Sequence, residues 1–249
     1  MNHIFHVHTF RCKHASDETD EDYVKTTLDL GAEKISFTDH TPFSGNPFGH
    51  RMSMEELPEY IASLKELRNK YEGKIDIEIG LEVEFLPSQI AFYQDLKNKF
   101  ELEPLIIGQH FYEHEDGTYS FNDDKEFNQE NEFVGCGNAM IEGMKTCIFK
   151  VAAHPDRIFR RCKGWSPEMT EMARRIIEVA AQNGVRLEKN FSSYEKFLEK
   201  SHFIYWREEF WDLVEEYNQT VERKVETIVG FDAHSTDDLK RRYSHLSEI

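Results

Sequence analysis

Six of the twelve histidines of this chain lie at the ends of short apolar runs. His6 and His8 close the first run, and their spacing would turn both side chains to the same side of a strand. A further histidine, His14, lies in the loop that follows. The residues at the run ends are His6, His8, His40, His110, His154, Asp232 and His234. Neutral imidazole with carboxylate suits Zn²⁺, Mn²⁺ or Fe²⁺, so the pattern predicts a site for such ions.

The stretch Ile75–Phe85 carries the acidic residue that would complete the ligand set. Apolar residues alternate there with polar ones, which predicts a strand with one polar face. Glu82 lies on that face, and Glu84, two residues on, is the alternative. Seven of the twelve histidines, together with Glu82 and Asp232, are too many ligands for one tetrahedral ion, so we expect more than one metal.

The elements that must position these residues alternate between short apolar strands and amphipathic helices, which indicates an α/β fold. The predicted strands are Ile4–His8, Lys34–Thr38, Ile75–Phe85, Leu105–His110, Phe149–Ala153, Val185–Lys189 and Thr227–Phe231. The predicted helices are Asp20–Leu30, Met54–Tyr71 after Ser53 as N-cap, Ser88–Phe100, a stretch within Glu126–Cys147, Glu168–Asn183 opened by Ser166-Pro167, and one within Tyr194–Asn218. Seven strands predict a short barrel over residues 1–249, a single domain with all strand ends on one face.

The composition indicates which partners and which cellular location to expect. With 30 basic and 47 acidic residues the net charge is −17, which opposes nucleic-acid binding. The four cysteines form no C-x-x-C pair, which favours a reducing, cytoplasmic location. We expect neither a signal peptide nor a membrane span, because the N-terminus lacks an apolar core and no apolar run approaches about 20 residues. Cys12 and Cys162 flank the loops of the predicted site but are not expected to bind metal.

Six short motifs give the chain a family resemblance. They are His6-Val7-His8-Thr9, Thr38-Asp39-His40, Gly80-Leu81-Glu82-Val83-Glu84, Gln109-His110-Phe111, Ala153-His154-Pro155-Asp156 and Asp232-Ala233-His234. In this ordered set the chain resembles the PHP (polymerase and histidinol phosphatase) family over nearly its whole length. Within that family it looks most like the monofunctional histidinol-phosphate phosphatases.

The resemblance implies a distorted (βα)₇ barrel, similar to a TIM barrel, with three divalent metal ions at the C-terminal ends of its strands. Carried over, the first ion takes His6, His8, Glu82 and Asp232. Glu82 bridges to a second ion, held also by His110 and His154. The third ion takes His14, His40 and His234. Few residues follow His234, so the closing helix is expected to be short or missing, and a homodimer is one way to cover that edge.

The hypothesis for the reaction is hydrolysis of a small phosphate monoester, L-histidinol phosphate, in histidine biosynthesis. A hydroxide bridging the first two ions would attack phosphorus in line. Arg157 is the candidate clamp for the phosphoryl oxygens, and Asp17 or Asp156 is the candidate proton donor to the leaving alkoxide. Asp39 and Asp156 are candidates to orient the neighbouring histidine ligands. Glu84, Asp17 and Asp123 could face the cationic part of the substrate.

Three alternatives stay open at this stage. One is another phosphoesterase of the same family with a different substrate. Another is a catalytically silent PHP domain that serves as an interaction module, although every ligand position is filled and no polymerase segment is attached. The last is a metal-dependent amide hydrolase, which shares the His-x-His start but often carries a lysine that bridges the metals.

Overall fold

The chain divides into two compact units. A computed structural model describes residues 2–120, 132–200, 205–246 and 249. The first unit comprises Met1–Glu82, Leu102–Leu105 and Val229–Ile249, and the second comprises Val83–Glu101 and Ile106–Ile228. The parallel strands and helices confirm the predicted α/β class. The predicted closed barrel and its single domain over residues 1–249 concern both units together and stay predictions.

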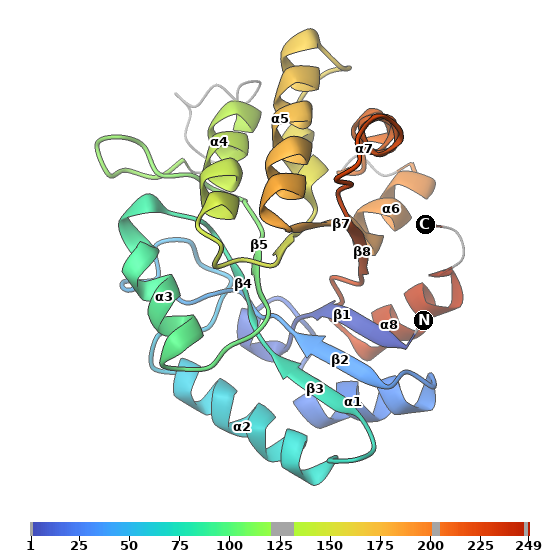
Figure 1. The fold of residues 1–249 in the computed structure, drawn as a ribbon. Coiled ribbons are helices and arrows are strands. Elements are labelled where there is room, and N and C mark those ends of the chain that lie inside the picture. The colour runs from blue at the N-terminus through green and yellow to red at the C-terminus, as the bar shows by residue number, and fades with distance from the viewer. Residues whose placement is uncertain (1, 121–131, 201–204, 247–248) are drawn as a thin grey trace. The chain divides into compact units, whose positions relative to one another are not determined.

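The first unit is built on a three-stranded parallel sheet with the order β1-β2-β3 (Figure 1). Its strands are β1 His3–Val7, β2 Lys34–Phe37 and β3 Asp76–Ile79. The register pairs Ile4 with Ile35 and Ile35 with Ile77, so apolar side chains meet across all three strands. The strands predicted at Ile4–His8 and Lys34–Thr38 are confirmed, with ends that differ by one residue.

The single strand predicted over Ile75–Phe85 is wrong, because it is two strands separated by Gly80. After β3 the chain continues as β4 Leu81–Val83, which belongs to the five-stranded sheet. A Cβ atom at Gly80 would lie 2.0 Å from the backbone oxygen of Pro104, so only glycine permits this close approach. The N–H of Leu81 donates to that same oxygen at 3.2 Å. The alternation of apolar and polar residues continues through Gly80, so it does not predict the interruption of the strand. The interruption depends on Pro104, which is distant in the sequence.

Three helices and a short 3-10 turn complete the first unit. They are η1 Phe10–Cys12, α1 Asp20–Asp29, α2 Leu57–Lys70 and α8 Thr236–Ser244. Helix α1 contacts both α2 and α8, and it begins with a capping box between Thr19 and Asp22. Helix α2 begins at Leu57 rather than after Ser53 as predicted. Pro58 lies in its first turn, where its ring is tolerated, whereas an earlier start would put that ring against a helical carbonyl.

The second unit contains most of a five-stranded sheet with the order β4-β5-β6-β7-β8. The strands that follow β4 are β5 Leu105–Ile107, β6 Val151–Ala152, β7 Arg186–Asn190 and β8 Thr227–Gly230. Its helices are η2 Pro87–Gln89, α3 Ile90–Asn98, α4 Glu132–Lys145, η4 Pro155–Phe159, α5 Pro167–Asn183, α6 Phe191–Leu198 and α7 Glu208–Thr220. Helix α5 packs against both α4 and α7 (Figure 1).

The helix predictions for this unit have mixed outcomes. Helix α5 is confirmed, with Ser166 as N-cap and Gly184 in the left-handed conformation after its last turn. The single helix predicted within Tyr194–Asn218 is wrong, because α6 and α7 are separate and residues 201–204 between them lie outside the described residues. Helix α4 confirms the helix within Glu126–Cys147, of which residues 126–131 also lie outside the described residues. The helix predicted at Ser88–Phe100 is the turn η2 followed by α3.

Candidate metal centre

The end of β1 places two imidazoles close together, with their ring planes tilted by 50°. The Nε2 atoms of His6 and His8 are 3.0 Å apart, and both side chains are fully buried. The sheet register shifts between Ile4 and Val7, and His6 has a φ angle of 66°. A non-glycine residue in this left-handed region costs on the order of 1–3 kcal/mol, so the surrounding structure must hold it there. The irregular strand end therefore turns two ring nitrogens toward one point.

Two carboxylates face the same point from other segments of the first unit. Glu82 Oε2 lies 3.5 Å from Nε2 of His6 and 3.4 Å from Nε2 of His8. Asp232 Oδ1 lies 3.3 Å from Nε2 of His8 and 3.8 Å from that of His6. Asp232 also has a positive φ, 48°, and buried Arg242 of α8 donates to its backbone oxygen at 2.9 Å. Helix α8 is short, as expected, but it is present, and its Arg242 holds the backbone of Asp232.

A second group of imidazoles lies beside the first. His14, His40 and His234 each offer a ligand atom, and these atoms lie within 4.8 Å of one another. Nδ1 of His14 is 2.9 Å from the Cys12 carbonyl oxygen and Nδ1 of His234 is 3.0 Å from that of Asp232, so each ring can donate there and leave Nε2 as the ligand atom. Nε2 of His234 is buried and has no hydrogen-bond partner. Nδ1 of His40 lies 3.0 Å from Glu82 Oε2.

The protonation states suit metal binding. Burial, with repulsion from His40 and His6, lowers the pKa of His8 to about 3, and burial together with His8 lowers that of His234 to about 3. Burial alone would raise the pKa of Asp232, but the adjacent histidines hold it well below its ordinary value. Neutral imidazoles and an ionised carboxylate are the donor set that Zn²⁺, Mn²⁺ and Fe²⁺ accept. The residues predicted for the first and third ions therefore fit divalent cations.

The histidines predicted for the second ion lie in the second unit. The rings of His110 and His154 have their centroids 5.0 Å apart. Glu84, the alternative to Glu82, instead contacts His110: its Oε1 is 2.7 Å from Nδ1, and its Oε2 accepts from the backbone N–H at 2.6 Å. His154 has a φ of 32°, and its backbone N–H donates to buried Glu188 at 2.9 Å. Glu82 belongs to the first unit, so the predicted bridge stays a prediction.

The predicted catalytic residues have different surroundings. Asp156, in η4, is buried, and its Oδ2 accepts from the backbone of Arg207 at 2.9 Å and from the indole of Trp211 at 3.1 Å. Burial raises the pKa of Asp156 to about 7. The guanidinium of Arg157 lies 5.2 Å from the ring centre of Tyr205. Asp17 is exposed in the loop between η1 and α1. Their roles stay predictions.

Two features of the site were not expected from sequence. Asp39, proposed to orient His40, accepts instead from the backbone N–H and the hydroxyl of Thr9, both at 2.8 Å. It therefore ties the loop after His8 to the loop that holds His40. Cys12, which was not expected to bind metal, lies with His8 and His234 in a further candidate group. The only signal for it in the sequence was its place two residues before His14.

The geometry defines a class of protein, an α/β fold with parallel sheets and buried groups of histidine and carboxylate that can hold metal. Comparison with known proteins then gives the family. The model of the PHP domain matches residues 5–192, so the chain belongs to the PHP domain family, and the resemblance drawn from its motifs is confirmed.

The relatives match nearly the whole chain. A Deinococcus radiodurans protein named as a probable histidinol-phosphatase is 28% identical over 249 residues, 96% of this chain and 88% of the relative. A Bacillus subtilis histidinol-phosphatase is 26% identical over 269 residues, 98% of this chain and 97% of the relative.

Two solved structures share the fold. A Listeria monocytogenes protein, provisionally assigned as the histidinol phosphatase hisK, matches with a TM-score of 0.75 at 21% identity, covering 97% of this chain and 98% of its own. The histidinol phosphate phosphatase of Lactococcus lactis, solved with zinc, L-histidinol and phosphate, matches with a TM-score of 0.66 at 17% identity, covering 98% of this chain and 92% of its own.

Among the described residues of the present chain, none of the helices has the length and apolar character needed to cross a membrane.

Proposed function

We propose that this protein is a metal-dependent phosphomonoesterase that hydrolyses L-histidinol phosphate to L-histidinol and phosphate. The observation that carries the proposal is the convergence of His6, His8, Glu82 and Asp232 on one buried point, where the pKa values of His8 and Asp232 are both lowered. The names of the two sequence relatives support the choice of substrate. So does the Lactococcus lactis structure, which was solved with the alcohol product and phosphate.

The proposed ligand sets follow the family resemblance. His6, His8, Glu82 and Asp232 hold the first ion, and His14, His40 and His234 hold the third. The second ion takes Glu82, His110 and His154. Within the second unit, Glu84 contacts Nδ1 of His110, so in the proposal Nε2 is the ligand atom. We expect zinc, manganese or iron, because these ligand types accept all three.

Bound divalent cations supply a water nucleophile that is deprotonated near neutral pH, and they offset the charge of the phosphoryl group. The chain adds an arginine and an acid. In the proposal the guanidinium of Arg157 binds phosphoryl oxygens, which it can contact through two parallel N–H groups. Asp156, whose pKa is raised by burial to about 7, holds a proton near neutral pH and gives it to the leaving alkoxide oxygen. Asp17, exposed in the loop that carries His14, is the alternative donor.

The cationic imidazole and amine of the substrate require acidic surroundings. The sequence offers Glu84, Asp17 and Asp123, and the surroundings of the first two differ. Glu84 is engaged by His110, whereas Asp17 is exposed on the loop that carries His14. Asp123 lies outside the described residues. Asp17 is therefore the residue we propose for contact with the cationic part of the substrate.

The test is a steady-state screen of metal-reconstituted protein against phosphate esters that include L-histidinol phosphate. We expect kcat/KM for L-histidinol phosphate to exceed the others by at least about a hundredfold, which corresponds to about 2.7 kcal/mol of differential transition-state binding. Comparable low rates on all esters would refute the substrate and leave the reaction class. Absence of hydrolysis with every metal would refute the reaction and favour a silent PHP module.

Metal analysis tests the proposed ligands separately. His14→Ala should lose one ion per chain, because its ring belongs to the third set alone. His3→Ala is the matched control, since His3 lies at the other end of β1 and contacts Ser36. Unchanged metal content in His14→Ala would mean that the third site is assigned wrongly.

A further inference from the structure

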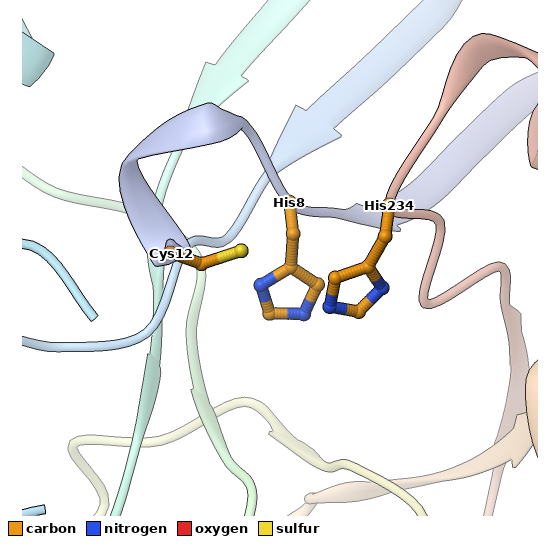
Figure 2. Close-up of side chains that lie close together, drawn as sticks. All are labelled: His8, Cys12 and His234. Atoms are coloured by element: carbon orange, nitrogen blue, oxygen red, sulfur yellow. The ribbon is translucent and has the colours of Figure 1, made fainter. Parts of the chain in front are cut away.

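A buried thiol lies beside two of the histidines described above. Cys12 ends the turn η1, and its side chain is 0% exposed. One ligand atom from each of His8, Cys12 and His234 lies within 4.8 Å of the others. Figure 2 shows the sulfur turned toward the ring of His8, with the ring of His234 beside it. The proposed phosphatase reaction assigns no role to this sulfur.

The two ring nitrogens of His8 have different neighbours. Nε2 lies 3.4 Å from Glu82 and 3.3 Å from Asp232. Nδ1 is buried, has no hydrogen-bond partner, and is the ring nitrogen nearest Cys12 in Figure 2. In His14 and His234 the corresponding Nδ1 lies within hydrogen-bond distance of a backbone carbonyl oxygen. An unpartnered buried nitrogen is costly, so the geometry calls for a further group between His8 and Cys12.

A metal ion is a group that all three side chains could bind at once. A thiolate with two imidazoles is a soft ligand set, preferred by zinc and cadmium over magnesium or calcium. Burial raises the pKa of the Cys12 thiol to about 12, and the backbone N–H groups of His14 and Ala15 offset this only in part, so a bound metal ion must displace the thiol proton. His234 offers Nε2, because its Nδ1 lies beside the Asp232 carbonyl oxygen. That same Nε2 belongs to the set proposed for the third ion, so the two sites cannot both be filled.

We propose that His8, Cys12 and His234 form an alternative site for one thiophilic divalent cation of the zinc and cadmium class, which takes His8 from the first ion and excludes the third ion by taking His234. On binding, the Cys12 thiol releases its proton to solvent, and a sulfur electron pair forms the bond to the metal. His8 binds through Nδ1, so the proton of its neutral ring lies on Nε2, beside the carboxylates of Glu82 and Asp232, and His8 is then not a ligand of the first ion. No oxidation or reduction occurs. The site depends only on metal binding and not on the phosphatase reaction.

The experiment is a cadmium titration monitored by sulfur-to-cadmium charge-transfer absorption in the ultraviolet. It uses full-length metal-free protein carrying Cys147→Ser and Cys162→Ser, because Cys147 is exposed and Cys162 partly so, and either could bind cadmium by itself. We expect one charge-transfer band that saturates at one ion per chain. Adding Cys12→Ser should abolish it. A band that persists in the Cys12→Ser protein, or that never appears in the parent protein, would overturn the proposal.

Two further measurements keep the test decisive if Cys12→Ser disturbs folding. X-ray absorption at the cadmium edge of the parent protein should show one sulfur neighbour, and a shell of nitrogen and oxygen alone would overturn the proposal. His14→Ala should keep the charge-transfer band, because His14 belongs only to the proposed third site, whereas loss of the band would mean that the site is not the one proposed. Failure of the ester screen would leave these results unchanged, so the two proposals can fail separately.

Discussion

Two groups in the first unit contain both histidine and glutamate, one near the N-terminal end of the three-stranded sheet and one just past the C-terminal ends of its strands, and their surroundings differ. At the N-terminal end, His3 Nε2 lies 2.6 Å from the Ser36 hydroxyl, which donates to Glu78 at 2.5 Å. Lys34 lies 2.6 Å from the same glutamate, and the three titratable side chains are about one-third exposed or less: 27% for His3, 28% for Glu78 and 31% for Lys34. The polar atoms of this group have hydrogen-bond and ion-pair partners in the protein, and the side chains are also partly exposed to solvent.

At the C-terminal end the corresponding groups are buried and face one another. Glu82 meets the rings of His6, His8 and His40 at 3.5, 3.4 and 3.0 Å. Burial keeps the His8 imidazole neutral, so it does not supply the positive charge that Lys34 supplies at the other end. The comparison teaches that histidine and glutamate alone do not mark a metal site; the burial of several of them around one point does.

Neutralising the glutamate at each end is the sharpest way to break this comparison. We expect Glu82→Gln to lower kcat/KM by on the order of a thousandfold, because a bound cation stabilises transition-state charge by several kcal/mol and each 1.4 kcal/mol is about tenfold. Glu78→Gln should keep activity within a few fold. Steady-state kinetics and metal content, measured together, check both. Similar losses in the two variants would show that the ends do not differ in function.

The acid sensitivity of the metal-free protein should come from the C-terminal end. The pKa of His8 in the folded chain, about 3, is below its ordinary 6.5, so its contribution to stability is present above pH 6.5 and is lost as the pH falls toward 3. Between pH 6.5 and about pH 4 this amounts to about 3 kcal/mol, since each pKa unit is worth about 1.4 kcal/mol. Urea unfolding across this range should show a shallower pH dependence for His8→Gln. An unchanged slope would contradict the assignment, and His3→Gln is the control.

Removing metal should destabilise the protein through the same end of the sheet. Lowering the free ion from about a hundredfold above its dissociation constant to far below it removes about 2.7 kcal/mol per site, because only the folded chain presents the assembled ligands. Urea unfolding with and without a chelator measures the difference. The chelator should lower the free energy of unfolding by less in Glu82→Gln than in Glu78→Gln. Superimposable unfolding curves with and without chelator would argue against metal ions at these residues.

The smallest effect is expected from the salt bridge at the N-terminal end. Lys34→Ala should cost less than about 1 kcal/mol of unfolding free energy, because a partly exposed ion pair contributes little. Its metal content and kcat/KM should not change. Chemical denaturation and metal analysis of this one variant suffice. A loss of metal in Lys34→Ala would show that the two ends of the sheet are coupled.

Local patterns were enough to predict much of the fold. The capped and glycine-terminated α5 was predicted at its ends, because Ser166, Pro167 and Gly184 act on their own neighbours. Where a distant segment intervened, prediction failed. Gly80 breaks a strand because Pro104 packs against it, and no local feature of the alternating pattern reveals that contact.

The sequence by itself determined which residues could bind metal, since their chemistry and their places at run ends are local properties. It also placed the chain in its family. Only the tertiary structure decided how they are arranged: Glu82 toward His8, Glu84 toward His110, and the Cys12 sulfur toward an unpartnered ring nitrogen. These choices depend on backbone turns such as those of His6 and Asp232, whose positive φ angles cost energy and persist only because the packed fold supports them.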